Sequence, residues 1–473
     1  MEKNLILFII FLPLLGAFLL PLVGCFSRAW RQILALAFVA APLFFSLRLV
    51  PLVTAGRSLN INGYFLADGL AVFMAVSSSL ISAVIIFYSF GYISRYENQN
   101  EYYCMVVLFL GAMMGLVFSA NLLLIYIFWE ITAVASWRLI GFFRDPQFVL
   151  KADKAFLITA FGALAMLLGF LCIYQQTGSF DLAVIKQTLK IFPLSNLAAA
   201  LILMGILSKS ATLPFHSWLP DAGVAPSPVT ALLHAAILVK IGVYVFARLF
   251  MINFQIAELW HTVVPVIAAA SAIVSAGAAF WETDLKRIIA YSTISQIGFI
   301  FFGLAIGNEI AAAGGLLYIL IHGLAKSGLF LCAGIIEQNT KTKDITKLGG
   351  LMQTMPVTAF SFLFCAFSVM GIPPFGGFFS KYLIFSGAVA AKQLGIGLVF
   401  LFGAFFTILY LFRVFNLVFL GEPRFPRAKE GSAVMVISVA ILAALSLLSG
   451  IFIYYPAKFM QITVWQMPGM LKW

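Results

Sequence analysis

Charged side chains are scarce in this sequence. Of its 473 residues only 10% are Asp, Glu, Lys or Arg, whereas 63% are hydrophobic. A soluble domain carries about 25% charged residues, because it must cover its core with a polar surface. A chain with less than half that share cannot build such a surface, so lipid must cover most of its exterior. The composition therefore excludes a soluble enzyme, a nucleic-acid-binding protein and a secreted disulfide scaffold.

Cysteine and histidine are also rare. The five cysteines lie singly in apolar stretches without a Cys-x-x-Cys motif, so we expect no disulfide, zinc or iron–sulfur framework. Among the four histidines the close pair is His216 and His234, whose segments flank a proline-rich loop, which argues against a shared haem. The sequence thus predicts a membrane domain with no cofactor, metal site or catalytic chemistry of its own. Membership of an enzyme complex stays open.

Apolar segments long enough to cross a bilayer recur along the chain. A spanning helix needs about 20 mostly apolar residues, and we expect about fourteen such helices in an all-α polytopic membrane protein. They lie near residues 4–24, 32–53, 69–93, 102–119, 121–141, 154–175, 195–216, 228–250, 261–281, 286–306, 310–336, 354–390, 396–420 and 432–455. The segment at 354–390 is long and broken. No small-residue cleavage site follows the first segment, so we do not expect a signal peptide.

Basic residues outnumber acidic residues, 29 against 17, and their distribution predicts an orientation. Fifteen lie in or at the ends of the odd-numbered connections, and nine, Arg248 among them, lie in the termini or in or at the ends of the even-numbered connections. Lys and Arg concentrate on the cytoplasmic side of membrane proteins. We therefore expect a multi-pass protein of a prokaryotic cytoplasmic (inner) membrane with both termini outside. The remaining five lie within predicted spans: Arg138, Lys209, Lys240, Lys326 and Lys381.

Charges inside the spans are the first candidates for function. A charged side chain at the centre of a spanning helix costs about 2.5–3.5 kcal/mol, and such groups usually face the interior of a bundle. Glu130 follows Asn121 by nine residues, so it lies about 14 Å deep at a rise of about 1.5 Å per residue. Lys240 lies in the middle of its span. His322 and Lys326 are four residues apart and share one helical face.

Two predicted helix breaks lie beside the other two lysines. Leu213-Pro-Phe-His follows Lys209, and Ile372-Pro-Pro-Phe-Gly-Gly precedes Lys381. Broken helices at corresponding places in two halves indicate inverted repeats around an ion site. We expect two inverted five-helix repeats, each with one broken helix. The predicted units are three amino-terminal helices (1–100), a first repeat (101–252), a second repeat (253–422) and a last helix with its tail (423–473).

Structural explanations remain for each residue taken singly. A buried lysine can be a fixed ion-pair partner, and a lysine near a helix end can reach the interface. Arg138 lies two turns past Glu130 near the predicted cytoplasmic end, which favours snorkelling or a partner contact. His216 can be a relay group or a local hydrogen-bond donor. An entirely structural explanation of all these groups, spread over five spans, is much weaker.

Four motifs contain most of the residues described above. They are Phe128-Trp-Glu-Ile with Ala135-Ser-Trp-Arg-Leu-Ile-Gly-Phe, Ser208-Lys-Ser-Ala-Thr-Leu-Pro-Phe-His-Ser-Trp-Leu-Pro-Asp-Ala with Ala225-Pro-Ser-Pro-Val-Thr-Ala-Leu-Leu-His, Asp284-Leu-Lys-Arg-Ile-Ile-Ala-Tyr-Ser-Thr-Ile-Ser-Gln-Ile-Gly, and His322-Gly-Leu-Ala-Lys-Ser-Gly-Leu-Phe. With these motifs the sequence resembles the antiporter-like membrane subunits of complex I and its relatives. Those relatives include membrane-bound hydrogenases, formate hydrogenlyases and multisubunit cation/proton antiporters. The resemblance covers roughly residues 65–420.

The resemblance implies a role for each matched residue in a proton pathway. The roles are a carboxylate–lysine pair (Glu130 and Lys209), a histidine that bridges the halves (His234), a connecting lysine (Lys240), a second-half relay (His322 and Lys326) and a terminal lysine (Lys381). Arg138 departs from the family's usual apolar residue, which leaves its role open. The chain ends soon after the fourteenth span, so we expect no long lateral helix of the kind found in the largest complex I member.

The implied function is proton, or cation/proton, translocation without chemistry on a substrate. Expected partners are lipid, protons or Na⁺ as the transported ion, and other membrane subunits of a redox-driven complex of the NADH dehydrogenase or energy-converting hydrogenase type, with the hydrogenase type favoured. Nucleic acid is not expected. The alternatives left open are a stand-alone secondary transporter of a cation or metabolite, a membrane-embedded enzyme or haem protein, and a subunit that only holds its neighbours.

Overall fold

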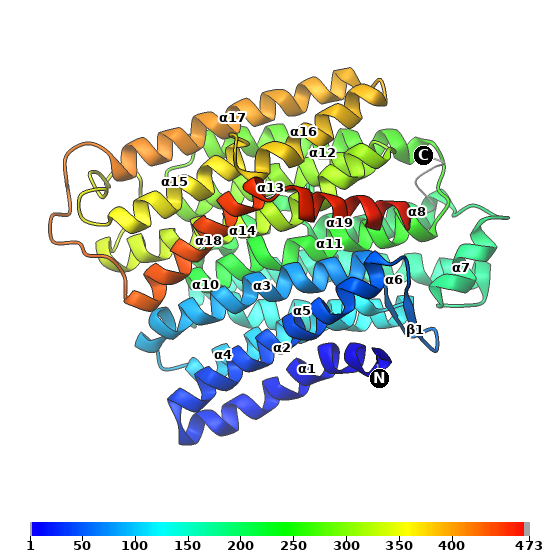
Figure 1. Cartoon of the computed structure of the whole chain (residues 1–473), viewed down its shortest axis with the longest axis horizontal. Coiled ribbons are helices and arrows are strands. Elements are labelled where there is room, and N and C mark those ends of the chain that lie inside the picture. The colour runs from blue at the N-terminus through cyan, green and yellow to red at the C-terminus, as the bar shows by residue number, and fades with distance from the viewer. Residues whose placement is uncertain (1, 468–473) are drawn as a thin grey trace.

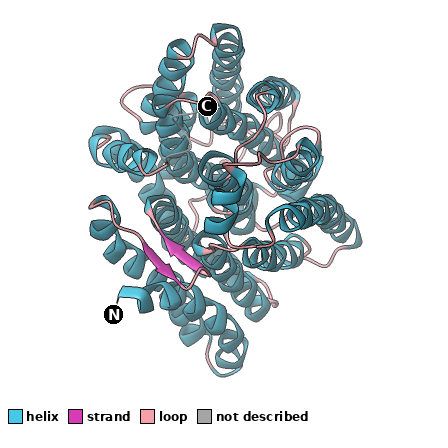
Figure 2. Cartoon of the chain, turned by 90° about the vertical axis from the view of Figure 1, so that its right-hand side faces the viewer, coloured by secondary structure: helices cyan, strands magenta, loops and turns pink. Residues whose placement is uncertain are grey.

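The computed structural model describes residues 2–467, and it is a bundle of helices that lie roughly side by side (Figure 1). The amino-terminal helices form one edge of the bundle, and the helices around residues 376–419 form the opposite edge (Figure 1). Within this described part, the sheet is a two-stranded hairpin of β1 (Leu59–Ile61) and β2 (Phe65–Ala67), which Figure 2 shows with most helices seen end-on. The prediction of an all-α polytopic membrane protein is confirmed.

Among residues 2–467, twelve helices are long and apolar enough to span a membrane. They are α1 (Glu2–Phe26), α2 (Arg28–Thr54), α3 (Gly69–Tyr92) with its 3₁₀ extension to Arg95, α4 (Gln99–Phe118), α5 (Leu122–Ile140), α6 (Pro146–Thr177), the compound helix Ser227–Asn253, α12 (Leu259–Trp281), α13 (Leu285–Ala305), α14 (Glu309–Thr340), α17 (Leu394–Phe419) and α18 (Ala433–Ile451). Shorter helices are α7 (Leu182–Leu189), α8 (Asn196–Lys209), α9 (Trp218–Asp221), α15 (Pro356–Met370), α16 (Gly376–Ala390) and α19 (Tyr454–Trp465). The predicted count of about fourteen, one of them long and broken, is not confirmed.

The seventh and twelfth predicted spans are interrupted, which explains the difference. The seventh was expected over 195–216, but α8 ends at Lys209 and the chain turns through Ala211, whose φ is +51°. The twelfth divides into α15 and α16 at Gly371, whose φ is +84°. In each case a proline of the predicted break follows the residue with positive φ by three positions: Pro214 follows Ala211, and Pro374 follows Gly371. The freed amide of Leu213 donates to the Ser271 hydroxyl at 3.1 Å, so this irregular backbone is satisfied inside protein.

The eighth span contains a feature that the sequence did not predict. Two π-helical segments, Ala231–Ala236 and Ala247–Asn253, flank the regular helix α11 (Leu238–Phe246). Such segments widen the turn and often lie at functional sites. They place His234 in the first segment and Arg248 in the second.

The two halves of the bundle share one pattern of caps and bridges. Asn121 and Asp284 cap α5 and α13, and each forms an isolated bridge, to Asp181 and Asp344 respectively. The second pair follows the first at a constant interval of 163 residues, and the caps of α6 and α14 (Asp145 and Asn308) keep the same interval. The same local geometry thus recurs at corresponding positions.

The bundle has two ends that differ in character. The hairpin end carries β1, β2 and α7; the other, here called the Asp284 end, carries the connections at residues 141–145, 282–284 and 341–355. The carboxy-terminal helices α18 and α19 return across the bundle (red in Figure 1) and contact α3 and α14. Together with α13 and the compound helix, α14 is almost entirely enclosed, whereas α1, α2, α6 and α17 expose large apolar side chains outward. Groups on the enclosed helices are therefore shielded from lipid.

Candidate functional site

Lys209 and Glu130 lie on neighbouring elements in the first half. Lys209 is fully buried at the end of α8, and its Nζ donates to the Trp129 carbonyl at 3.1 Å. The ammonium also lies 5.2 Å from the centroid of the Trp129 ring, a favourable cation–π distance. Lys209 thus contacts the residue directly before Glu130, and the charges of the lysine and the carboxylate act on each other. No ion pair within 4 Å joins them among the described residues, so the implied pair is open in this structure.

Glu130 itself is incompletely satisfied. Its side chain is partly exposed at the surface of α5, close to the Tyr126 hydroxyl, while Oε1 is buried and has no hydrogen-bond partner in the described part of the chain. A carboxylate at membrane depth is costly in lipid. The group is therefore placed to respond either to Lys209 or to a charge brought up from outside this chain.

His322 lies at the centre of three lysines. It is fully buried on α14, and the charges of Lys240, Lys326 and Lys381 all act on it. Lys240 reaches α14 from α11: its Nζ donates to the Ala235 carbonyl, and a Cβ on Gly323 would lie only 2.6 Å from that Nζ. The structure thus brings together groups from α11, α14 and α16 around one imidazole whose two nitrogens have no partner within residues 2–467.

Lys326 and Lys381 are linked by polar side chains that the sequence analysis did not single out. Lys326 Nζ donates to the Ser292 hydroxyl and, at 3.3 Å, to the Ile289 carbonyl. The row continues from Ser292 to Tyr410, from Gln296 to Thr407 at 3.1 Å, and from Tyr318 to Gln296 at 2.6 Å. Ser292 and Gln296 lie within the motif that begins at Asp284, but neither is charged, and Thr407 and Tyr410 lie outside all four motifs. The sequence therefore provides no reason to join these residues into one row.

Lys381 occupies the break between α15 and α16. Its Nζ donates to the Val369 carbonyl at 2.8 Å, at the carboxyl end of α15 where unpaired carbonyls and the helix dipole favour a cation. The ammonium lies 4.8 Å from the centroid of the Phe299 ring and 5.8 Å from that of Tyr318. Through Tyr318 the Lys381 site adjoins the polar row that leads to Lys326.

His234 lies where the two halves meet. Its ring is fully buried against Phe330 of α14, with 4.8 Å between ring centroids, and the charges of Lys326 and Lys286 act on it. Neither imidazole nitrogen has a hydrogen-bond partner in the described residues. The histidine therefore sits between the central lysines and the Asp284 end.

The two possible accessory residues lie outside this arrangement. Arg138 forms an ion pair with Glu101 at the start of α4, and Arg144 joins the same carboxylate at 2.9 Å. His216 lies in a 3₁₀ turn after the first break and is partly exposed. The geometry gives Arg138 a local contact between α4 and α5.

The hairpin end holds a charged pair that the sequence analysis assigned wrongly. Arg248 was counted as a residue of an even-numbered connection, but it is buried inside the compound helix and forms an ion pair with Asp68. A second contact joins Arg248 Nη2 to Asp68 Oδ1 at 2.8 Å, and Arg248 Nε donates to Tyr244 at 2.9 Å. Burial alone would raise the pKa of Asp68, but the Arg248 charge and its hydrogen bonds outweigh this and hold the pKa below its usual range. A cavity of about 460 Å³ adjoins the pair.

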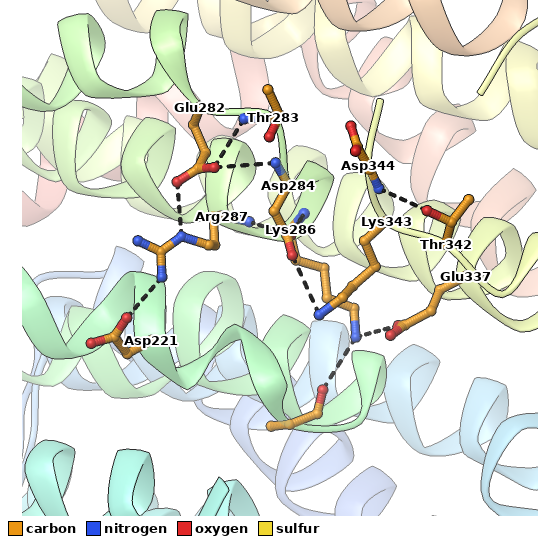
Figure 3. Close-up of polar contacts among 11 residues, drawn as sticks. Asp221, Glu282, Thr283, Asp284, Lys286, Arg287, Glu337, Thr342, Lys343 and Asp344 are labelled. Carbon is orange, nitrogen blue, oxygen red and sulfur yellow. Dashed lines mark hydrogen bonds and ion pairs between the residues drawn. The ribbon is translucent and has the colours of Figure 1, made fainter. Parts of the chain in front are cut away.

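The Asp284 end carries a larger network of charges (Figure 3). Asp221 binds both Lys154 of α6 at 2.7 Å and Arg287 of α13 at 2.8 Å, so it connects the two halves. Arg287 also binds Glu282 at 2.8 Å. Burial alone would raise the pKa of Asp221. Hydrogen bonds and charges from Lys154 and Arg287 lower it by more, so the net pKa lies below its usual range.

A pH dependence of stability follows from this shift. Because the pKa of Asp221 is lowered on folding, its contribution is complete above the ordinary value of about 4 and is lost as the pH falls through the folded value. We expect Asp221→Asn to destabilise the protein by about 1 kcal/mol at neutral pH, as for a partly exposed ion pair, and to have little effect at low pH. Thermal unfolding in detergent at both pH values measures this, and equal losses at both would contradict it.

Comparisons with known proteins agree with one another. Residues 119–407 match the family model described as NADH:quinone oxidoreductase/Mrp antiporter, TM, and residues 53–103 match that of NADH-ubiquinone oxidoreductase (complex I), chain 5 N-terminus. One Na(+)/H(+) antiporter subunit of Alkalihalophilus pseudofirmus is 37% identical over 84% of this chain. One Na(+)/H(+) antiporter subunit of Staphylococcus aureus is 33% identical over 94%. The chain spans 53% and 60% of the length of these two relatives.

Two solved structures share the fold. The chain is similar to one in the Mrp complex from Dietzia sp. DQ12-45-1b, with a TM-score of 0.89, 22% identity, and 98% of this chain and 97% of the other covered. It is also similar to one in the membrane-bound sulfane sulfur reductase, an archaeal respiratory membrane complex, with a TM-score of 0.92, 21% identity, and 100% and 99% covered. At these identities the likeness shows the fold alone.

Proposed function

The chain belongs to the NADH:quinone oxidoreductase/Mrp antiporter family, as its motifs predicted, and on this premise we propose that it moves protons, or exchanges a cation for protons, as an antiporter-like subunit of a membrane assembly. One observation carries the proposal: a fully buried histidine stands among three buried lysines from three helices. Buried ionisable groups at membrane depth are expensive, and in proteins they mark proton and ion pathways.

The proposed pathway comprises the sequence-predicted residues. In order they are Glu130, Lys209, His234, Lys240, His322, Lys326 and Lys381. An opposite charge stabilises a buried ammonium, whereas desolvation favours the neutral amine. When Glu130 approaches Lys209, the lysine keeps its proton; in the open arrangement it tends to release the proton towards the central lysines. Charge thus travels laterally from one lysine to the next, with the polar row through Ser292 and Gln296 as its last part.

We propose the same division of the chain and the same orientation as the sequence predicts. The repeated caps and bridges support two five-helix repeats at 101–252 and 253–422, and an odd number of crossings per repeat makes their directions opposite. The terminal unit 423–473 includes six residues outside the described part. The basic connections around residues 282–347 at the Asp284 end support a cytoplasmic location for that end, in a prokaryotic inner membrane with both termini outside.

The expected partners are other membrane subunits, with protons or Na⁺ as the transported ions. The partly exposed Glu130 supports a protein neighbour against α5, because lipid would leave its charge unpaired. The chemistry that drives transport is then supplied elsewhere in the assembly, and we propose no cofactor in this chain. A redox-driven respiratory or hydrogenase-type complex and a cation/proton antiporter remain two versions of this proposal.

Reconstitution of the native assembly tests the proposal. Vesicles containing the purified assembly and a trapped pH dye should acidify or alkalinise when a Na⁺ gradient, or the electron donor of its redox subunits, is supplied. Chain expressed alone serves as the comparison, and we expect no transport from it. Transport by the isolated chain would favour a stand-alone transporter, and no proton movement by the intact assembly would contradict the proposal.

A further inference from the structure

A buried ion pair at the Asp284 end lies outside the pathway just described. Lys286 of α13 is 2% exposed at its side chain, and its Nζ lies 2.5 Å from Glu337 Oε2 of α14 (Figure 3). The same Nζ donates to the Ala225 carbonyl at 3.2 Å. Glu337 remains 29% exposed. One partner is therefore accessible from the end of the bundle, whereas the other is enclosed.

Glu337 belongs to a stripe on α14 that leads to the central lysines. Gly334, Phe330, Lys326 and His322 follow it at intervals of three or four residues, so all five positions share one face of the helix. Glu337 and Lys326 are eleven residues apart, a distance of about 16 Å along the helix axis. The stripe thus connects the Asp284 end with the depth at which Lys326 and His322 lie.

The segment that faces this stripe carries matching polar groups. A Cβ on Gly334 would lie 2.8 Å from the Ser227 hydroxyl and 2.7 Å from the Tyr88 hydroxyl, so the absence of a side chain there lets both approach α14. One turn deeper, His234 packs against Phe330. The charges of Lys286 and Lys326 both act on His234, so the imidazole lies within electrostatic range of both ammonium groups.

From this geometry we propose that Glu337 and Lys286 form a proton-loading pair, which supplies His234 and then Lys326 from the Asp284 end. The inference rests on the proposed function and adds an access route and two residues to it. Water at the Asp284 end gives a proton to the Glu337 carboxylate. Lys286, which has then lost its compensating charge in an enclosed site, releases its own proton to His234, directly or along the hydroxyl groups beside Gly334.

The step returns the pair to its starting state. The protonated carboxyl of Glu337 passes its proton to the neutral amine of Lys286, which restores the carboxylate and the ammonium. His234 then gives its proton to Lys326 when that lysine is neutral. One proton thus leaves water and one reaches the central lysines, without any oxidant, reductant or further reactant.

Lys286→Arg is the sharpest variant, because a guanidinium keeps the ion pair but does not release its proton near neutral pH. We expect the assembly to form normally and proton transport in vesicles to fall at least about tenfold, as when a proton-transferring side chain is lost. The matched control is Lys343→Arg. Lys343 pairs with Asp284 at 3.3 Å in the same network, but it lies outside the α14 stripe, so its variant should transport like the wild type.

The double variant Glu337→Gln/Lys286→Met separates a loading pair from a purely structural one. Replacing both partners removes the penalty of an unpaired buried charge, so a structural pair should tolerate it with full transport. We expect intact assembly and the same loss of at least about tenfold in transport. Wild-type transport by either Lys286→Arg or the double variant overturns the inference. Failure of the wild-type assembly to move protons instead contradicts the proposed function.

Discussion

Proton transport by the reconstituted assembly is expected to fall at least about tenfold in both Glu130→Gln and Lys209→Arg, the loss typical of removing a proton-transferring group. Glu130→Gln removes the negative charge that stabilises the Lys209 ammonium when the pair closes. Lys209→Arg keeps a positive charge beside the Trp129 ring, but a guanidinium holds its proton near neutral pH. The structure shows the pair open, with Lys209 on the Trp129 carbonyl, and the proposed mechanism uses both the open and the closed arrangement.

Each variant has a matched control at an exposed position outside the spans. Glu258→Gln and Lys190→Arg make the same chemical changes at the hairpin end, where both side chains face outward. We expect both controls to assemble and transport like the wild type in the pH-dye assay. Size-exclusion chromatography of each purified assembly checks that Glu130→Gln and Lys209→Arg still bind their partners. Full transport by either variant would contradict the roles proposed for this pair.

Asp68→Asn should cause the largest loss of stability among single substitutions at the hairpin end. Removing one partner of a buried ion pair costs about 3–5 kcal/mol, because the other charge is left without compensation. Arg248 is 2% exposed at its side chain, so its charge is largely removed from water. Asparagine caps helices as well as aspartate does, so the cap of α3 on Ala71 should survive and the loss should report the ion pair.

Asp145→Asn is the control for that substitution. Asp145 caps α6 through Gln147 in the same way, and it forms no ion pair within residues 2–467. Thermal unfolding of the purified assembly in detergent should show a clear decrease for Asp68→Asn and almost none for Asp145→Asn. Equal shifts would mean that the Arg248 contact contributes little. A large loss of stability in Asp68→Asn would also show that Asp68 compensates the charge of Arg248, which explains how the second π-helical segment holds an arginine inside a span.

Much of the fold follows from local composition. Apolar runs of about 20 residues cross a membrane whatever their neighbours are, and the prolines after Lys209 and before Lys381 interrupt helices for reasons of backbone chemistry. These features predicted the polytopic all-α fold and the positions of both breaks. The exact end of the seventh span was missed, because the chain leaves the helix through Ala211, and alanine gives no signal for a left-handed turn.

The residues of the candidate site also fall into those that the sequence predicts and those that only the structure shows. The unusual charges at Glu130, Lys209, Lys240, Lys326 and Lys381 are visible in sequence because ionisable groups stand out in apolar segments. Ser292, Gln296 and Tyr410 do not stand out, since hydroxyl and amide side chains are common in spans. Arg248 was assigned to a connection because it lies near a segment end, and only its partner Asp68, far away in sequence, shows that it is buried.

The sequence by itself determined that this protein is embedded in a membrane and that its helices break at two places. It also determined that ionisable groups lie within the membrane-spanning segments. Hydrophobic transfer and proline geometry act over one or two helical turns, so neighbouring residues suffice to predict them. Tertiary structure alone decided that three lysines surround His322, and that Glu130 and Lys209 stand apart. It also decided that Glu337, the residue of the α14 stripe nearest the Asp284 end, forms an ion pair with Lys286. Such distances depend on how α5, α8, α11, α13, α14 and α16 pack, and helix packing is set by contacts between residues remote in sequence.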